Sequence, residues 1–411
     1  MAADPLLSVE EARARILAGL IALPTEEVSL RIACGRVLAQ SMRAGSASPA
    51  AAVSAMDGYA VEAKRIGSVP AELAISQTIP AGTPASPLAP GTAARIFTGA
   101  VMPEGADAVV IQEDTERRGD RVVIRTAPAA GRHIRPAGSD FAAGDIGLHA
   151  GCSLTPRDIG LAAAMNAAHL SVRRRPCVAI LATGDELIRP GGAPAPHQTI
   201  ASSGYALAAA LTVWGAEAIE LGLVRDDEAA IATAIDGARE CDLLLTLGGA
   251  SVGDHDLVQR ALAHLGFTLN FWKVAMRPGK PLLYGRLGAL PVMGLPGNPV
   301  STLICALLFV RPMIRTWLGC RSADGRPDID LPRREAILAK PLAPNGPRAD
   351  YMRGRLIEPE AGAPVVKAFE RQDSSHLMAL AGAGCLIPRT PFAPASKAAS
   401  PHTIVPLAGL F

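Results

Sequence analysis

A glycine turn followed by aspartates stands in the stretch CDLLLTLGGASVGDHD, which runs from Cys241 to Asp256. The apolar run before Gly248 and Gly249 has the composition of a strand that is buried on both faces of a parallel sheet. The residues after it predict a helix, and a helix start beside a glycine turn attracts anions such as phosphate. Taken alone, the aspartates of this turn are better explained as capping groups.

Acids and bases recur along the second half of the sequence in a pattern that suits a metal-bound phosphate. Hard oxygen ligands, which favour Mg²⁺ over soft metals, are offered by Glu186, Asp226, Asp254 and Asp256. The segment KVAMRPGKP brings together Lys273, Arg277 and Lys280. Together with Ser251 and Ser301, these cations suit a phosphate and a second oxyanion.

Three further candidates lie in the first half of the chain, and for each the local structural interpretation is favoured. Asp57 precedes Gly58 in a turn dipeptide, and Thr98 follows a predicted strand directly. Asp140 shares a glycine-rich loop with Arg132, His133 and Arg135. Such a loop meets an anionic substrate or is simply solvated.

Several classes of protein are excluded by composition and motif. The net charge of +2 argues against nucleic acid or an anionic membrane as the main partner. The seven cysteines include no CxxC pair, which is typical of reduced thiols in the cytoplasm. No signal peptide is predicted, and the longest apolar stretch, around 303–310, is too short to span a bilayer. Nucleotide-binding GxGxxG and P-loop motifs and a nucleophile elbow are missing from the strand ends.

The elements that must position these residues alternate between strand and helix from Cys177 to about Gly319. Pro312 is expected to end or kink the long apolar helix over VSTLICALLFV. In an open α/β sheet, ligands bind at the carboxyl ends of the strands. Four polar turns are predicted there, at 183–186, 224–227, 248–256 and 295–299, and their convergence favours a functional site over capping alone.

The remaining segments are predicted to be mostly β or short helix. Ser8 and Glu11 form a capping-box pattern before a first helix, and a second helix is expected over ACGRVLAQ. The segment 44–145 reads as β-rich, and LTPRDIGLAAAMN reads as a helix with proline at its first position. We expect this helix to join the N-terminal helices in an elongated domain.

The motifs SAMDGYAV, IFTGAVMP, LATGDEL, LLLTLGGASVGDHD, KVAMRPGKP and GLPGNPVS, in this order, resemble the molybdopterin molybdenumtransferase family, which includes gephyrin-type proteins. The resemblance runs through nearly the whole chain, including QDSSHLMAL near the C-terminus. It implies a multidomain α/β plus β fold, with a central three-layer α/β molybdopterin-binding domain. The implied divisions are an elongated domain (1–43 and 146–174), a β-rich domain (44–145), the α/β domain (175–325) and a C-terminal β-barrel (326–411).

The resemblance also implies a cytoplasmic homodimer that inserts molybdate into adenylylated molybdopterin with release of AMP. Asp57, Thr98 and Asp140 would reach the α/β site of the partner subunit. Mg²⁺ would be held by Glu186, Asp226 and Asp256. Lys273, Arg277 and Lys280 would complete the catalytic set. Substrate would be bound by Thr183, Gly184, Ser202, Gly248, Gly249, Ser251, Gly297, Asn298, Pro299 and Ser301. A molybdopterin adenylyltransferase is a candidate partner.

The sequence departs from the family pattern at three places. Ala201 and Ser203 flank Ser202 where the family has an Asp or Asn and an Asn, and Gly384 stands where it has Asn. Arg277 stands where some members have Lys, and it offers a planar fork instead of a point charge. Two other functions remain open: a molybdopterin adenylyltransferase, and a non-catalytic scaffold of the same fold.

Overall fold

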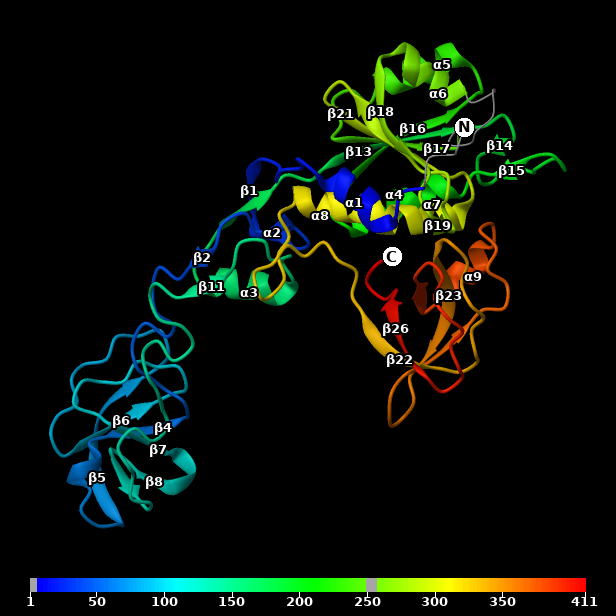
Figure 1. Cartoon of the computed structure of the whole chain (residues 1–411). Coiled ribbons are helices and arrows are strands. Elements are labelled where there is room, and N and C mark those ends of the chain that lie inside the picture. The colour runs from blue at the N-terminus through cyan, green and yellow to red at the C-terminus, as the bar shows by residue number, and fades with distance from the viewer. Residues whose placement is uncertain (1–5, 249–256) are drawn as a thin grey trace.

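The computed structural model describes residues 6–248 and 257–411, and it has an extended shape in which a β-rich region lies far from the rest (Figure 1). Gly249, Ser251, Asp254 and Asp256, which the sequence assigned to the site, lie outside the described residues. Four regions follow one another along the molecule: β-rich, elongated, α/β and C-terminal barrel.

The β-rich region is a six-stranded sheet of order β7-β4-β6-β5-β9-β8. Its central strands are buried on both faces: along β4, Tyr59 and Val61 join one apolar cluster and Ala60 joins another. The strands are β4 (Gly58–Val61), β5 (Ala71–Ile79), β6 (Thr92–Ile96), β7 (Ala108–Ile111), β8 (Thr115–Arg118) and β9 (Arg121–Ile124). The short pair β3 (Val53–Ser54) and β10 (Ile134–Arg135) lies beside it.

The elongated region joins two distant pieces of chain. The antiparallel pairs are β1 (Thr25–Ser29) with β12 (His169–Arg173), and β2 (Met42–Arg43) with β11 (Ile146–Leu148). The helix α3 (Pro156–Ala164) begins with a capping box between Thr155 and Asp158, has proline at its start, and is followed by Asn166 at φ 65°. The helix expected over ACGRVLAQ is wrong: α2 is only Leu30–Ala33, and Val37 and Leu38 instead form β-bridges.

The α/β region has a sheet of order β16-β13-β17-β21-β20-β18. Its first four strands are parallel and include the nearly continuous apolar runs that a sheet covered on both faces requires. They are β13 (Cys177–Thr183), β16 (Glu217–Val224), β17 (Leu243–Leu247) and β21 (Leu290–Leu295), with antiparallel β18 (Phe267–Trp272) and β20 (Leu283–Leu287) at one edge.

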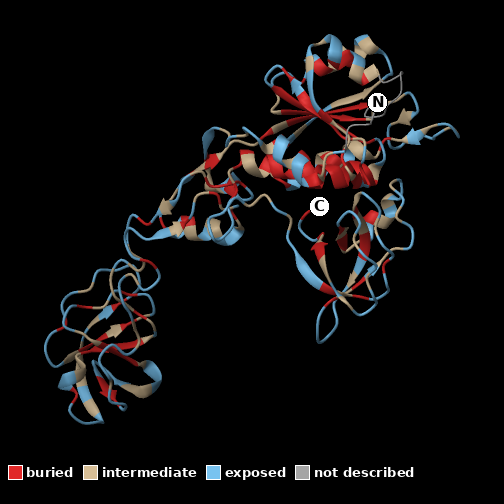
Figure 2. Cartoon of the chain, viewed as in Figure 1, coloured by how far each residue is buried: buried red, intermediate tan, exposed pale blue. Residues whose placement is uncertain are grey.

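Helices cover both faces of this sheet, with the buried core between the layers (Figure 2). On one face lie α5 (Glu228–Asp236) and α6 (Leu257–His264). On the other face lie α4 (Ser203–Val213), α7 (Pro299–Cys305), the π-helical turn η3 (Ala306–Val310) and α8 (Arg311–Trp317). The first helix, α1 (Val9–Leu17), has the expected capping box but packs on η3 and α8, whereas we expected all of residues 1–43 in the elongated region.

The apolar helix does not end at Pro312. It continues as one run, Pro299–Trp317, with the π-helical turn η3 ending two residues before the proline. A π-turn inserts an extra residue, which removes the hydrogen bond that proline cannot donate and relieves the clash of its ring with the preceding turn. This run is long and apolar enough to cross a membrane, but most of it is buried inside the fold.

The C-terminal region is a closed five-stranded barrel in which each strand pairs with two others. Its strands are β22 (Arg334–Leu338), β23 (Ala349–Ile357), β24 (Val365–Ala368), β25 (Cys385–Arg389) and β26 (Pro401–Pro406), and α9 (Leu377–Ala381) lies between two of them. A sixth strand, β19 (Met276–Arg277), belongs to the α/β region in sequence but pairs with β23. The barrel is therefore joined to the segment that carries the predicted cations.

Candidate functional site

A pocket of about 630 Å³ opens at the carboxyl ends of β13, β17 and β21, where the sequence predicted the site. Seven predicted residues line it: Thr183, Glu186, Ser202, Gly248, Gly297, Asn298 and Pro299. The strand ends touch one another here, since a Cβ on Gly248 would lie 3.4 Å from the Thr183 carbonyl and one on Gly297 would lie 3.8 Å from Gly248 Cα. The parallel register thus brings the three turns into one concave surface.

Gly248, which directly follows β17, lies between the ends of β13 and β21. Gly248 has φ 89°, and its N–H donates to the Leu295 carbonyl at 3.3 Å. The loop after β21 continues into α7, with Asn298 as N-cap and Pro299 as the first helical residue, as the sequence predicted. Ser301 is buried inside α7 and does not line the pocket.

Three carboxylates gather at the ends of β13 and β16. The Asp226 N–H donates to Asp185 Oδ1 at 3.3 Å, and burial, followed by the charges of Asp185 and Glu186, raises the pKa of Asp226. Gly184 has φ 143°, and a Cβ there would lie 2.7 Å from Glu186 Oε2, so the glycine allows the acid to fold back over the turn. Asp185 is a member of this group that sequence reasoning missed, although it stands inside the TGDE motif.

The described residues contain no set of three His, Cys, Asp or Glu side chains arranged to hold a metal. Glu186 and Asp226 are close enough for their charges to interact, and neither has a cationic partner in an ion pair within the described chain. Asp256, the third predicted ligand, lies outside the described residues. The donors that are present are carboxylate oxygens, which fit a hard divalent cation.

The KVAMRPGKP segment forms a tight loop between β18 and β20. The Lys273 N–H donates to the Leu282 carbonyl at 2.9 Å, and the Val274 N–H donates to the Lys280 carbonyl at 3.0 Å. These hydrogen bonds hold the two lysines on one loop, and Pro281, the last residue of the segment, lines the pocket. The Lys273 ammonium lies 3.9 Å from the centroid of the Trp272 ring, a favourable cation–π geometry.

Arg277 is held by the C-terminal barrel. Its guanidinium pairs with the Asp350 carboxylate, with Nε 3.0 Å from Oδ2, and the hydrogen bonds to Asp350 raise the pKa of Arg277. The Asp350 side chain is only 3% exposed and its Oδ1 has no hydrogen-bond partner, whereas the Arg277 side chain is 52% exposed. The buried Asp350 carboxylate thus fixes the orientation of the guanidinium, while much of the Arg277 side chain stays accessible to solvent.

The barrel also contributes directly to the pocket, which sequence reasoning did not assign. Ser375 and Leu377 line it, and the Asn298 amide donates to Ser374 Oγ at 2.9 Å. The Val300 N–H donates to the Ser374 carbonyl at 3.1 Å. The motif QDSSHLMAL marked this segment, but sequence could not show that it returns to the α/β edge.

Asp57 and Thr98 come together in the β-rich region. The Thr98 N–H and hydroxyl both donate to Asp57 Oδ1 at 2.8 Å, and these bonds, the N–H first, lower the pKa of Asp57. Asp140 is exposed in the loop between β10 and β11, and its N–H donates to the Ser48 carbonyl at 3.0 Å. All three belong to a region far from the pocket within one chain (Figure 1).

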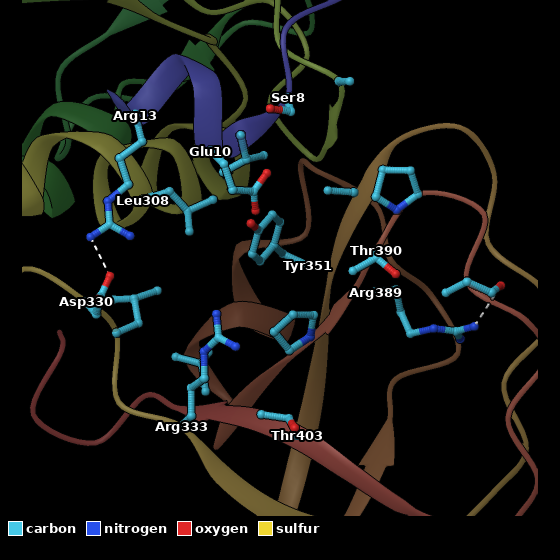
Figure 3. A pocket seen from close by; sticks show the side chains of 18 of the residues that line it. Ser8, Glu10, Arg13, Leu308, Asp330, Arg333, Tyr351, Arg389, Thr390 and Thr403 are labelled. Carbon is cyan, nitrogen blue, oxygen red and sulfur yellow. Dashed lines mark hydrogen bonds and ion pairs between the residues drawn. The ribbon is translucent and has the colours of Figure 1, made fainter. Parts of the chain in front are cut away.

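A larger cavity of about 880 Å³ lies between α1, α8 and the barrel, and it contains none of the predicted site residues. Figure 3 shows Glu10, Tyr351 and Arg333 directed into it. Burial raises the pKa of Tyr351 to about 12, so its hydroxyl remains protonated at neutral pH. Because the predicted residues line the smaller pocket instead, the larger volume of this cavity does not make it the candidate site.

Sequence comparison identifies known relatives of each part of the chain. Family profiles match as “MoeA N-terminal region (domain I and II)” over residues 7–166, “Probable molybdopterin binding domain” over 179–316 and “MoeA C-terminal region (domain IV)” over 335–391. Molybdopterin molybdenumtransferase 2 of Mycobacterium tuberculosis is 38% identical over 372 residues, covering 88% of this chain and 89% of that protein. Molybdopterin molybdenumtransferase of Haemophilus influenzae is 33% identical, covering 93% and 94%.

The fold agrees with these relatives. The crystal structure of a molybdopterin biosynthesis MoeA protein from Pyrococcus horikosii superposes with a TM-score of 0.82 at 26% identity, covering 98% of this chain and 99% of that one. The expected multidomain α/β plus β fold, with its small C-terminal barrel, is confirmed by this similarity. With relatives this similar over nearly the whole chain, the protein belongs to the molybdopterin molybdenumtransferase family, the transferases of molybdenum cofactor biosynthesis.

Proposed function

We propose that the protein transfers molybdenum, supplied as molybdate, to adenylylated molybdopterin and releases AMP. The observation that carries this proposal is the pocket at the ends of β13, β17 and β21, where glycine turns, Glu186 and serines meet beside the loop that carries Lys273 and Lys280. A substrate with two phosphates needs charge compensation and fixed hydrogen-bond donors, and both kinds of group lie at this edge.

Binding of the anions falls to the cationic loop and the neighbouring turns. Lys273, Lys280 and Arg277 supply positive charge for molybdate or for the phosphate oxygens, and Arg277 offers a planar fork. Thr183, Ser202, Gly297 and Asn298 line the pocket and would hold the organic part of the substrate. Gly249, Ser251 and Ser301 complete the proposed set from the sequence motif, although the described structure does not place them in the pocket.

Mg²⁺ is the metal that the carboxylates fit, and Glu186, Asp226 and Asp256 are its proposed ligands. Burial, and then the charges of Asp185 and Glu186, raise the pKa of Asp226, and a cation that joined this group would favour its charged form, which supports the assignment. When bound, Mg²⁺ screens the charge of the phosphates and polarises the bond to be broken. Positioning by the surrounding side chains would provide the rest of the catalysis, without a covalent intermediate.

The site is completed by a second copy of the chain. Asp57, Thr98 and Asp140 lie on a β-rich region that is far from the pocket of their own chain, which supports a homodimer in which they reach the pocket of the partner subunit (Figure 1). We retain the four domains expected from the sequence, with α1 reassigned to the α/β domain because of its packing. The seven free cysteines support a reducing cytoplasm, where a molybdopterin adenylyltransferase would supply the substrate.

The test is AMP release from purified adenylylated molybdopterin with Mg²⁺, measured with and without molybdate. Molybdate-dependent AMP release with formation of the molybdenum cofactor is expected, and removal of Mg²⁺ by a chelator should abolish it. Lys280→Ala and Glu186→Gln should each lower the rate, since they remove a cation and a metal ligand. Unchanged rates in both variants would overturn these assignments.

The alternatives give different results in the same assay. An adenylyltransferase would form adenylylated molybdopterin from ATP and molybdopterin. A scaffold, tested as a folded dimer, would neither form adenylylated molybdopterin nor release AMP from it. Retention of Asp57, Glu186 and Asp226 together favours catalysis over a scaffold, which has no use for these acids.

A further inference from the structure

Two cysteine side chains meet at the edge of the α/β sheet opposite the pocket. Cys177 opens β13, and Cys241 lies just before β17, the strand that pairs with β13 in parallel. Their sulfur atoms are 3.0 Å apart, and both residues are partly exposed. The contact joins positions 64 residues apart in sequence.

The backbone around this contact is held from three directions. The Asp242 carboxylate accepts a hydrogen bond from the Cys177 N–H at 2.7 Å, and the Asp242 N–H donates to the Cys177 carbonyl at 2.8 Å. Arg174 donates to both oxygens of Asp242 at 2.9 Å. Because Asp242 directly follows Cys241, this network fixes the two thiols side by side.

We infer that Cys177 and Cys241 form a reversible intramolecular disulfide, a redox modification site independent of the transferase reaction. The oxidant we name is a low-molecular-weight disulfide such as oxidised glutathione. The thiolate of Cys177 attacks one of its sulfur atoms, forms a mixed disulfide and releases one thiol. Cys241 then loses its proton and attacks Cys177 Sγ, which forms the intramolecular bond and releases the second thiol. Two thiols of the protein are oxidised, and one small disulfide is reduced to two thiols.

The surroundings of the two cysteines determine which of them reacts first with the small disulfide. Burial, and then the neighbouring Cys177 and Asp242, raise the pKa of Cys241 to about 12, so it stays a neutral thiol in the reduced protein. Once Cys177 is a mixed disulfide, its hydrogen bond and charge no longer oppose ionisation of Cys241.

The other cysteines provide internal references. Cys305, Cys320 and Cys385 are buried, and burial raises the pKa of each, so they should be inert. Cys34 is exposed and reports access of the oxidant to a lone thiol. The Cys177–Cys241 pair differs from all of these because it combines partial exposure with a second sulfur in reach.

The position of the pair predicts what oxidation would change. The bond would join the amino ends of β13 and β17, whereas the pocket lies at their carboxyl ends. It would also fix the point where β12 passes into the α/β region, four residues after Arg173. We expect oxidation to raise the midpoint of thermal unfolding of the α/β region and to leave AMP release within twofold.

The experiment uses the full-length reduced protein, treated with oxidised glutathione and then alkylated and digested for mass spectrometry. The expected product is a Cys177–Cys241 linked peptide that dithiothreitol removes and that forms within one chain. Mixing light and isotope-labelled protein distinguishes this from a bond between chains. A full yield of modified Cys34 with no Cys177–Cys241 link would overturn the inference, as would a link found only between chains.

Single variants test the order of the two steps. Cys241→Ser should stop the reaction at the mixed disulfide, with glutathione retained on Cys177. Cys177→Ser should leave Cys241 less modified than Cys177 is in Cys241→Ser, because burial still raises the pKa of the Cys241 thiol. The matched control Cys34→Ser should leave the yield of the linked peptide unchanged. Equal glutathione labelling of Cys177 and Cys241 in the two variants would contradict the assigned order.

Discussion

At the scale of single residues, the site depends on side chains whose partners are distant in sequence. Arg277 owes its orientation to Asp350, and the hydrogen bonds from Thr98 lower the pKa of Asp57. In neither contact do the two partners belong to one sequence motif, so each contact is created by the fold. Each can be tested by substitution.

Asp350→Asn should weaken catalysis without touching the pocket. The substitution removes the charge that orients Arg277, so that the guanidinium samples other positions in solvent. We expect kcat/KM for AMP release to fall about tenfold, equivalent to ~1.4 kcal/mol of transition-state stabilisation. The measurement is steady-state AMP release at varied molybdate.

The matched control is Asp328→Asn, which breaks the Arg315–Asp328 ion pair away from the site. It should leave kcat/KM within about twofold, because neither residue lines the pocket and most substitutions away from buried features change little. If Asp350→Asn behaves like this control, the barrel does not position Arg277 for the reaction.

Thr98→Val should raise the pKa of Asp57 toward its ordinary value of 3.8. Valine keeps the N–H donor and removes the hydroxyl donor, so part of the lowering should remain. Because the pKa is lowered in the fold, the contribution of this carboxylate to stability is present above its unfolded pKa and is lost as the pH falls through the lowered value.

Carboxyl-carbon NMR of the wild type and the variant, titrated from neutral pH to below pH 3, measures the change directly. Thr92→Val is the control, because its hydroxyl donates to the Ala89 carbonyl and does not contact Asp57. A pKa of Asp57 that is identical in all three proteins would contradict the assigned cause.

At the scale of elements, the cationic loop depends on one glycine. Gly279 has φ 106°, and a Cβ there would lie 2.3 Å from Cys305 Sγ, in the buried helix α7. Gly279→Ala should therefore carry the penalty of its backbone conformation and an additional overpacking cost of ~1–3 kcal/mol. We expect a lower thermal midpoint and reduced AMP release, because Lys280 is displaced with the loop.

Gly266→Ala provides the matched control. Gly266 also has a positive φ, 88°, but a Cβ there would meet no atom within 4 Å. It should show only the smaller cost of the backbone conformation, ~1–2 kcal/mol. Equal effects of the two substitutions on AMP release would mean that contact with Cys305 does not shape the loop.

The elements themselves were largely predictable. The buried apolar run of β17, the capping box of α1 and the proline start of α3 each have a local signal in the sequence. The helix expected over ACGRVLAQ failed because tertiary structure overrode local preference. Val37 and Leu38 satisfy their backbone groups through bridges to Ser153 and Val172, and a π-turn carries the long helix past Pro312.

Only those parts of the candidate site that have a local signal in the sequence could be predicted. Residues at strand ends, such as Thr183 and Gly248, could be placed because parallel strands align their carboxyl ends. Ser375 and Asp350 could not, since they arrive from the barrel through pairings that no local periodicity encodes.

At the scale of the whole molecule, the proposed site needs two chains. Asp57→Ala and Glu186→Gln would each inactivate a homodimer, the first through the β-rich region and the second through the pocket. Mixed after dissociation and reassociation, half of the dimers would be heterodimers with one intact site each. Activity should then recover to about a quarter of the wild-type value.

The readout is AMP release before and after mixing, with dimer exchange followed by native mass spectrometry of tagged chains. Mixing Glu186→Gln with Lys280→Ala is the control, because both residues belong to the pocket side of the same chain, and no recovery is expected. Recovery in neither mixture, with exchange demonstrated, would place Asp57 in the site of its own chain or in none.

The pairing of β19 with β23 has a consequence for how this architecture can be recombined. Met276 and Arg277 pair with Ala349 and Asp350 as neighbouring strands, and Arg277 also forms an ion pair with Asp350. The conformation of the cationic loop therefore depends on the barrel. A chimera that takes its barrel from a relative should therefore work only when the 276–277 and 349–350 segments come from the same parent. The barrel and the loop would be inherited as one unit, although more than seventy residues separate them.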